Sequence, residues 1–268
     1  MFHGLKRIID ENWVWRRQAW SLAVMDLVKS YRGAALGWIW LFVKPVIYIA
    51  VFWFAIDIGM RSGSPVNGYP FIYWLAAGIF PWFFIRDMLD SGSSVLNRYS
   101  FLVNRLRFPL SVISTFFAIS RMLVCVGTLA VMMFIAACAG YAPTIYWLQI
   151  PLVLVITLLF WIGWSIAISP LCAFSQDFSN LVKTVSMPLF WMSGILFQLG
   201  NMPEWVQAIM RFNPVTWCAE SIRDSLIYNQ WIWSQKADLG AFVIVFVVMW
   251  MVAGLSFGKL SKEVADVL

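Results

Sequence analysis

Residues 146–173 read YWLQIPLVLVITLLFWIGWSIAISPLCA and contain no charged side chain. A helix needs roughly 20 mostly apolar residues to cross the hydrocarbon core of a bilayer, and this stretch is long enough. A spanning helix satisfies its backbone hydrogen bonds internally, and the alternating pattern of a membrane β-strand is absent here. The stretch therefore predicts a transmembrane helix.

Outward from this run, five further apolar stretches have the same character. Hydrophobic residues make up 62% of the chain and charged residues only 12%, more apolar surface than a soluble domain of this length could bury. We therefore predict an all-α integral membrane protein with six transmembrane helices, in which the fifth span is the shortest. The other five spans are predicted at residues 36–60, 69–89, 111–139, 184–200 and 239–258.

The distribution of basic residues predicts the orientation. The net charge is +6, and lysines and arginines collect on the cytoplasmic side of membrane proteins. With both termini inside, most of them lie in inner segments, and the outer segments hold only Arg61, Arg211, Arg223 and Lys236. We predict a multi-pass protein of the cell membrane with cytoplasmic termini. The positive charge then needs no nucleic-acid partner.

The residues that usually carry catalysis are scarce. The only histidine is His3, and the cysteines Cys125, Cys138, Cys172 and Cys218 form no CxxC pair, so we expect buried thiols and no metal site. The only Gly-Lys pair is followed by Leu260, so no phosphate-binding P-loop is present. We expect no catalytic residue and no cofactor in this chain.

The N-terminal segment, residues 1–33, is predicted to lie in the membrane interface. Leu5, Ile8, Ile9 and Trp13 fall on one helical face, and charged residues fall elsewhere. A plain solvated helix is the alternative. Residues 34–268 would form one membrane domain.

Two connections are more than tight turns. The inner one, residues 91–109, predicts a short basic amphipathic helix, either a positive-inside loop or a docking element for a cytoplasmic partner. The outer one, residues 201–238, predicts one or two short re-entrant helices before the last span, with an ordinary surface segment as the alternative. Its marker residues are Pro203, Trp205, Asn213, Pro214, Glu220 and Arg223.

Arg121 lies inside the third predicted span, where a charge costs about 2.5–3.5 kcal/mol. It needs a partner, for which Asp87 and Asp90 are candidates, or a wet path for an anionic substrate. Aromatic residues make up 18% of the chain, and most suit interfacial belts or packing. As a candidate substrate path we group Arg121 with Trp38, Trp40, Tyr48 and Trp74.

Three motifs resemble the ABC-2 type permeases that export lipid-linked polysaccharides. They are Tyr31 to Trp40 with Lys44-Pro45, Asn104 to Ser111, and Asn213-Pro214 with Glu220 and Arg223. Within this family the wall teichoic acid permeases are most similar. That closer likeness rests on residues 58–75, 108–113 and 264–268.

The resemblance implies a half-transporter. Two copies would form the path, and two copies of a separate ATP-binding subunit, which carries ATP and Mg²⁺, would dock beneath. The cargo would be a polymer on a polyprenyl diphosphate, moved from the inner to the outer leaflet. Coupling to the ATPase would use Arg98, Asn104, Arg105, Arg107, Phe108, Pro109 and Asp177.

One position departs from the family pattern. Many members carry an Arg-Asp pair after the fourth span, where this chain has Gln176-Asp177. Any role of that arginine would be absent in this chain, or another basic residue such as Lys183 would take it over. The competing interpretations are an ABC-2 permease for another lipid or a drug, and a membrane enzyme acting on lipid-linked sugars, although the acidic residues are scattered rather than clustered.

Overall fold

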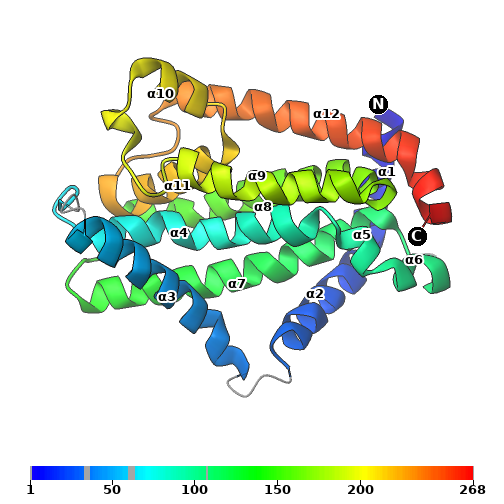
Figure 1. Ribbon diagram of the computed structural model, residues 1–268, viewed down its shortest axis with the longest axis horizontal. Coiled ribbons are helices and arrows are strands. Elements are labelled where there is room, and N and C mark those ends of the chain that lie inside the picture. Colours follow the sequence, from blue (N-terminus) through cyan, green and yellow to red (C-terminus); the bar gives the residue numbers. More distant parts are fainter. Residues whose placement is uncertain (1, 33–36, 60–63, 107, 268) are drawn as a thin grey trace.

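The computed structural model describes residues 2–32, 37–59, 64–106 and 108–267. Within these ranges the regular structure is helical, and the only β-pairing is an isolated bridge between Val66 and Tyr69. Figure 1 shows long helices side by side, with both termini at one end of the bundle and helices α10 and α11 at the other. We call these the terminal end and the far end.

Five helical stretches among the described residues are long and apolar enough to cross a membrane: Gly37–Gly59, Phe71–Gly92, Leu110–Cys138, Ile145–Phe174 and Lys236–Ser261. Apolar length sets these boundaries, and each agrees with a predicted span to within a few residues. They contain, in order, α3 (Trp40–Trp53), α4 (Phe71–Asp87), α7 (Leu110–Cys138), α8 (Ile150–Phe174) and most of α12 (Lys236–Val267).

The remaining predicted span, residues 184–200, differs from the helix found there. Helix α9 covers Gln176–Met192 and is followed by a turn in which Gly194 has φ +70°. Helix α9 starts earlier because Ser175 accepts a hydrogen bond from the backbone N–H of Phe178 and so caps it. With 17 residues and a polar first half, α9 is shorter than the five spans, so a sixth crossing is not confirmed.

Helix α4 is the centre of the bundle, and its side chains are buried along most of its length. It packs against α3, α7 and α11, and α8 packs along α12. Helices α3 and α12 instead expose apolar side chains, including Val46, Ile47, Ile244 and Val248. Such surfaces suit contact with lipid or with another membrane protein.

The predicted N-terminal interface segment forms two helices, α1 (Phe2–Val14) and α2 (Arg16–Tyr31). Helix α1 crosses α12 closely, because a Cβ atom on Gly4 would lie 2.2 Å from the carbonyl oxygen of Gly254. Helix α2 lies along α7. The segment is thus packed onto the membrane helices.

Short helices occupy both connections that the sequence marks as unusual. The connection at the terminal end holds α5 (Val95–Arg98) and α6 (Ser100–Leu106), and that at the far end holds α10 (Glu204–Met210) and α11 (Pro214–Arg223). A π-helical turn, Asp224–Tyr228, extends α11. These two ends carry the candidate functional residues.

Candidate coupling and substrate sites

Most of the predicted coupling residues lie at the terminal end (Figure 1). Arg98 of α5 and Asn104 of α6 are exposed, and so is Asp177 in the first turn of α9. Asn97 donates a hydrogen bond to the carbonyl oxygen of Cys172 at 3.4 Å, which ties α5 to the end of α8. Arg105 belongs to α6, and Arg107 lies outside the described residues.

Phe108 and Pro109 connect this region to α7. Phe108 is buried, and its ring meets that of Trp15 edge to face at 4.9 Å. Pro109 is the residue before α7, where its fixed φ is compatible with a helix start. A groove of about 580 Å³ opens beside this contact, lined by Trp15, Arg17, Gln18, Ser21, Leu22, Leu102 and Phe108. The groove offers a mixed apolar and basic surface at the terminal end.

The predicted apolar face of the N-terminal helix is divided between two environments. Ile8 is buried in the core and Leu5 is half-buried. Ile9 and Trp13 are instead 63% and 70% exposed. One side of α1 therefore packs on the protein, while Ile9 and Trp13 face outward, as an interfacial helix requires.

Arg121 is paired with a residue that the sequence reasoning did not single out. Its Nη2 lies 2.6 Å from a carboxylate oxygen of Asp26 in α2, and not against Asp87 or Asp90. Asp26 also accepts hydrogen bonds from the Tyr99 and Ser120 hydroxyls, and Asp90 pairs with Arg86. Both members of the Asp26–Arg121 pair are nearly buried, which joins α2 to α7.

The environment of Asp26 keeps its carboxylate ionised. Burial by itself raises the pKa of this carboxyl, but the Tyr99 hydroxyl, the Arg121 guanidinium and the Ser120 hydroxyl together lower it below its usual value. The signal in the sequence is an acidic residue within the mostly apolar run from Leu22 to Val28. Its partner could not be identified from that signal.

The four aromatic residues of the candidate substrate path make different local contacts. Trp38 stacks on Tyr31 at the junction of α2 and α3, and Trp40 begins α3. Tyr48 accepts a hydrogen bond from Arg86 at 3.1 Å. Trp74 is fully buried at the far end. The four aromatic residues thus have separate surroundings.

The marker residues of the far end build the start of each short helix. Pro203 is the N-cap residue of α10, and Trp205 in the first turn is 68% exposed. Asn213 caps α11 by accepting a hydrogen bond from the backbone N–H of Val215, and Pro214 takes the first helical position. The Asn213 amide also donates to the Ser193 hydroxyl at 2.8 Å, which links α11 to the end of α9.

Arg223 is the centre of this end of the molecule. Its side chain is fully buried and donates hydrogen bonds to the carbonyl oxygens of Gly194, Ile195 and Trp74, at 2.8, 2.7 and 3.3 Å. It also pairs with Glu220 at 2.7 Å. One guanidinium therefore holds α4, α11 and the turn after α9 together.

The position of Arg223 depends on Gly78 of α4. A Cβ atom at Gly78 would lie 2.5 Å from Nη2 of Arg223, which is closer than atoms of this kind approach. The guanidinium also stacks over the Trp74 ring, 3.5 Å from its centroid. Gly78 was not predicted as a site residue, because the sequence does not show which side chain packs against a glycine in a membrane helix.

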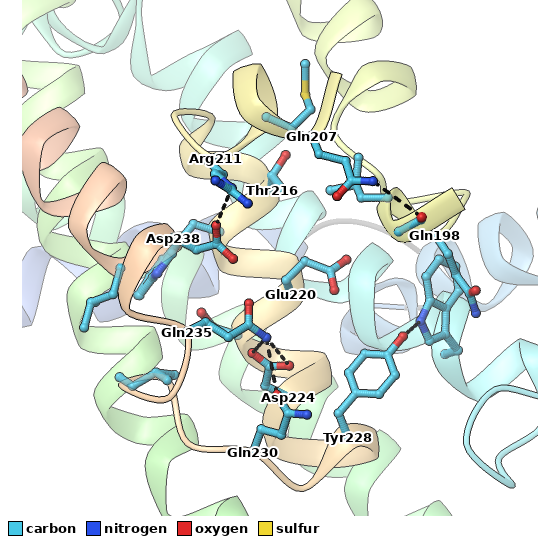
Figure 2. Close-up of a pocket in the computed structure, with 18 residues that line it drawn as sticks. Gln198, Gln207, Arg211, Thr216, Glu220, Asp224, Tyr228, Gln230, Gln235 and Asp238 are labelled. Atoms are coloured by element: carbon cyan, nitrogen blue, oxygen red, sulfur yellow. Dashed lines mark hydrogen bonds and ion pairs between the residues drawn. The ribbon is translucent and has the colours of Figure 1, made fainter. Parts of the chain in front are cut away.

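Beside this arginine lies a pocket of about 410 Å³ (Figure 2). Its polar lining comes from the turn after α9, from α10 and α11, from the start of α12 and from the connections between these helices. The polar residues are Gln198, Gln207, Arg211, Thr216, Glu220, Ser221, Asp224, Tyr228, Gln230, Gln235 and Asp238. Trp74, Trp217 and Leu239 contribute apolar surface. The glutamines were not predicted as site residues, because they come from segments brought together only by the fold.

Several of these polar groups hold one another in place. Arg211 pairs with Asp238 at 3.1 Å, and the Gln235 amide donates to both carboxylate oxygens of Asp224. The Trp74 indole N–H donates to the Tyr228 hydroxyl at 3.0 Å. Burial, with the nearby Glu220 and Asp238 carboxylates, raises the pKa of Asp224 to about 7.

The chain is similar to known transport proteins along most of its length. A family model described as "ABC-2 type transporter" matches residues 17–227. An O-antigen export system permease protein RfbA of Myxococcus xanthus is 22% identical over 97% of this chain and 98% of its own length. A protein of the same name from Klebsiella pneumoniae is 27% identical over 91% and 92%, respectively.

Proposed function

The chain belongs to the ABC-2 type transporter family, and from this premise we propose that it is the membrane subunit of an ATP-driven polysaccharide exporter. Its cargo is a polymer attached to a polyprenyl diphosphate, which it moves from the inner to the outer leaflet. The observation that carries the proposal is the full-length similarity to permeases named for O-antigen export. The sequence, which has no P-loop, supports ATP hydrolysis by a separate subunit.

The terminal end supports a role in docking that subunit. Exposed Arg98, Asn104 and Asp177 lie there, and a groove opens between α2 and α6. In this proposal the ATP-binding subunit contacts α5, α6 and the basic residues Arg105 and Arg107. Because α2 is tied to α7 through Asp26 and Arg121, a movement of the docked subunit would be transmitted to a membrane helix.

The identity of the exported polymer is a more specific proposal. The likeness at residues 58–75, 108–113 and 264–268 supports a teichoic acid, whereas the names of the relatives support an O-antigen type of polysaccharide. Both are polymers built on a lipid carrier, so the transport step is the same. A second copy of this chain would complete the path, and the exposed apolar side chains of α3 and α9 offer a surface for it.

Charge reversal at the docking segment tests the coupling role. In the double variant Arg105→Glu and Arg107→Glu, the amount of ATP-binding subunit that co-purifies with the tagged chain should fall about tenfold or more. Lys236→Glu, at the far end, is the matched control and should leave the ratio of the two subunits unchanged. If the unmodified chain, the double variant and Lys236→Glu all recover the same amount of ATP-binding subunit, then α6 and its neighbours are not part of the docking surface.

A further inference from the structure

The far-end pocket is lined by groups that bind hydroxyls. The amides of Gln198 and Gln230 can donate and accept hydrogen bonds. The amide oxygens of Gln207 and Gln235, whose N–H groups bond within the protein, can accept them, as can the Glu220 carboxylate. A sugar hydroxyl also donates and accepts hydrogen bonds. The volume of about 410 Å³ falls in the range of small-molecule sites, roughly 300–1,000 Å³. The pocket therefore has the size and chemistry for a compact, hydroxyl-rich ligand.

The charges around the pocket disfavour an anion. Among the described residues that line it, three are acidic, Glu220, Asp224 and Asp238, and Arg211 is the one cation. Arg211 is paired with Asp238. Arg223 lies behind the wall and donates to three carbonyl oxygens and to Glu220. Phosphate sites rely on an available guanidinium, ammonium or row of backbone N–H groups, so a phosphate here would face carboxylates instead.

The same carboxylates are not arranged as a metal site. The described part of the chain contains no group of three histidine, cysteine or acidic side chains placed to hold a metal ion. Asp224 is already bonded by the Gln235 amide, and Asp238 by Arg211. Glu220 is paired with Arg223, so each of the three carboxylates is held by a neighbouring side chain and serves as a hydrogen-bond acceptor.

The apolar part of the lining complements a sugar ring. Trp217 is stacked on Phe242, with centroids 3.8 Å apart, so the indole is held rigidly. Leu199, Ile232 and Leu239 add aliphatic surface. The C–H faces of a sugar pack against such surfaces while its hydroxyls reach the surrounding polar side chains.

We propose that the far-end pocket binds an uncharged sugar unit of the exported polymer through its hydroxyls and rejects phosphate-bearing units. The inference rests on the proposed function, and it specifies which part of the cargo the far-end pocket binds. A polymer with phosphate in its backbone would be held here by its sugars alone.

Ligand binding to the full chain, purified with its ATP-binding subunit in lipid nanodiscs, tests the proposal. Saturation-transfer NMR is measured with methyl hexosides and methyl N-acetylhexosaminides, and with the matching hexose phosphates. We expect saturable binding of at least one neutral glycoside and about tenfold or more weaker binding of its phosphate. Gln198→Ala should weaken glycoside binding several-fold, because this side chain lines the pocket.

Gln176→Ala is the matched control, since Gln176 is an exposed glutamine at the start of α9, at the other end of the molecule. It should bind like the unmodified protein, and both variants should elute as folded complexes in size-exclusion chromatography. The proposal is overturned if no neutral glycoside binds, if the phosphates bind equally well, or if the two variants behave alike. Polymer export in cells is measured separately. Export without sugar binding would contradict this inference but would still be consistent with the proposed function.

Discussion

Two buried arginines hold two regions of this molecule together in different ways. Within α7, Arg121 pairs with Asp26 of α2, which lies 95 residues away in the sequence, and two hydroxyls complete the cluster. At the far end, Arg223 pairs with Glu220 one helical turn away and gives its other hydrogen bonds to backbone carbonyls. The first cluster joins two helices, whereas the second fixes a turn and a short helix against α4.

This difference indicates how much each region depends on its arginine. When Arg121 is removed, Asp26 still accepts hydrogen bonds from the Tyr99 and Ser120 hydroxyls, so its carboxylate remains partly satisfied. The carbonyl oxygens of Gly194, Ile195 and Trp74 share one guanidinium, and removing it takes a donor from all three. We therefore expect the far end to be the more sensitive of the two, and the following substitutions test this order.

The largest effect is expected for Arg223→Met. Removing this guanidinium takes a donor from three buried carbonyl oxygens, and each buried acceptor left unsatisfied costs about 1–3 kcal/mol. The yield of folded protein extracted from membranes should fall sharply. Arg211→Ala is the control, because the Arg211–Asp238 pair is partly exposed and contributes only about 0–1 kcal/mol. Similar yields for both variants would show that Arg223 is not the centre of the far end.

Arg121→Ala should have the next largest effect, a loss of about 1–3 kcal/mol, since one charge-assisted bond to Asp26 disappears. Because Arg121 is paired with Asp26, we expect export to fall in proportion to the amount of folded protein. The comparison is made by quantifying both in the same membranes. Export that falls far more than folded protein would instead give Arg121 a direct role in transport.

Gly78→Ala is expected to cost less, about 1–2 kcal/mol, because the added methyl group displaces the guanidinium of Arg223 without removing it. The apparent Tm in detergent is the measurement. Gly127→Ala in α7 is matched to it, since a Cβ atom there meets no other heavy atom within 4 Å. A lower Tm for Gly127→Ala than for Gly78→Ala would contradict the close packing at Gly78.

A final prediction concerns pH. The pKa of Asp224 is raised from 3.8 to about 7, so its contribution to stability is fully present below about pH 4 and is lost as the pH rises to about 7. Burial raises this pKa most, the Glu220 and Asp238 carboxylates raise it further, and the Arg223 guanidinium opposes them. In Asp224→Asn the apparent Tm should depend less on pH in this window. An unchanged slope would show that another group titrates there.

The sequence predicts the membrane helices well, because apolar length alone decides where five of them begin and end. It also predicts the short helices at both ends, since proline and polar residues interrupt the apolar pattern there. The predicted fifth span, residues 184–200, extends several residues past the end of α9, because the turn at Gly194 is stabilised by Arg223, which comes much later in the chain.

The site residues were harder to predict. Arg121 and Arg223 stand out in the sequence as charges that need partners, but Asp26 and Gly78 become their neighbours only through tertiary packing. The four glutamines of the far-end pocket come from the turn after α9, from α10 and from the loop before α12. No local pattern marks them, so the pocket could not be predicted.

The most direct test of the central claim is the fate of the polymer in cells that lack this chain. Lipid-linked polysaccharide is measured inside the cell and at its surface, before and after the gene is deleted and restored. The account predicts that deletion leaves the lipid-linked polymer inside and the surface depleted, and that the restored gene reverses both. Surface polymer at the normal level in the deleted strain would contradict it.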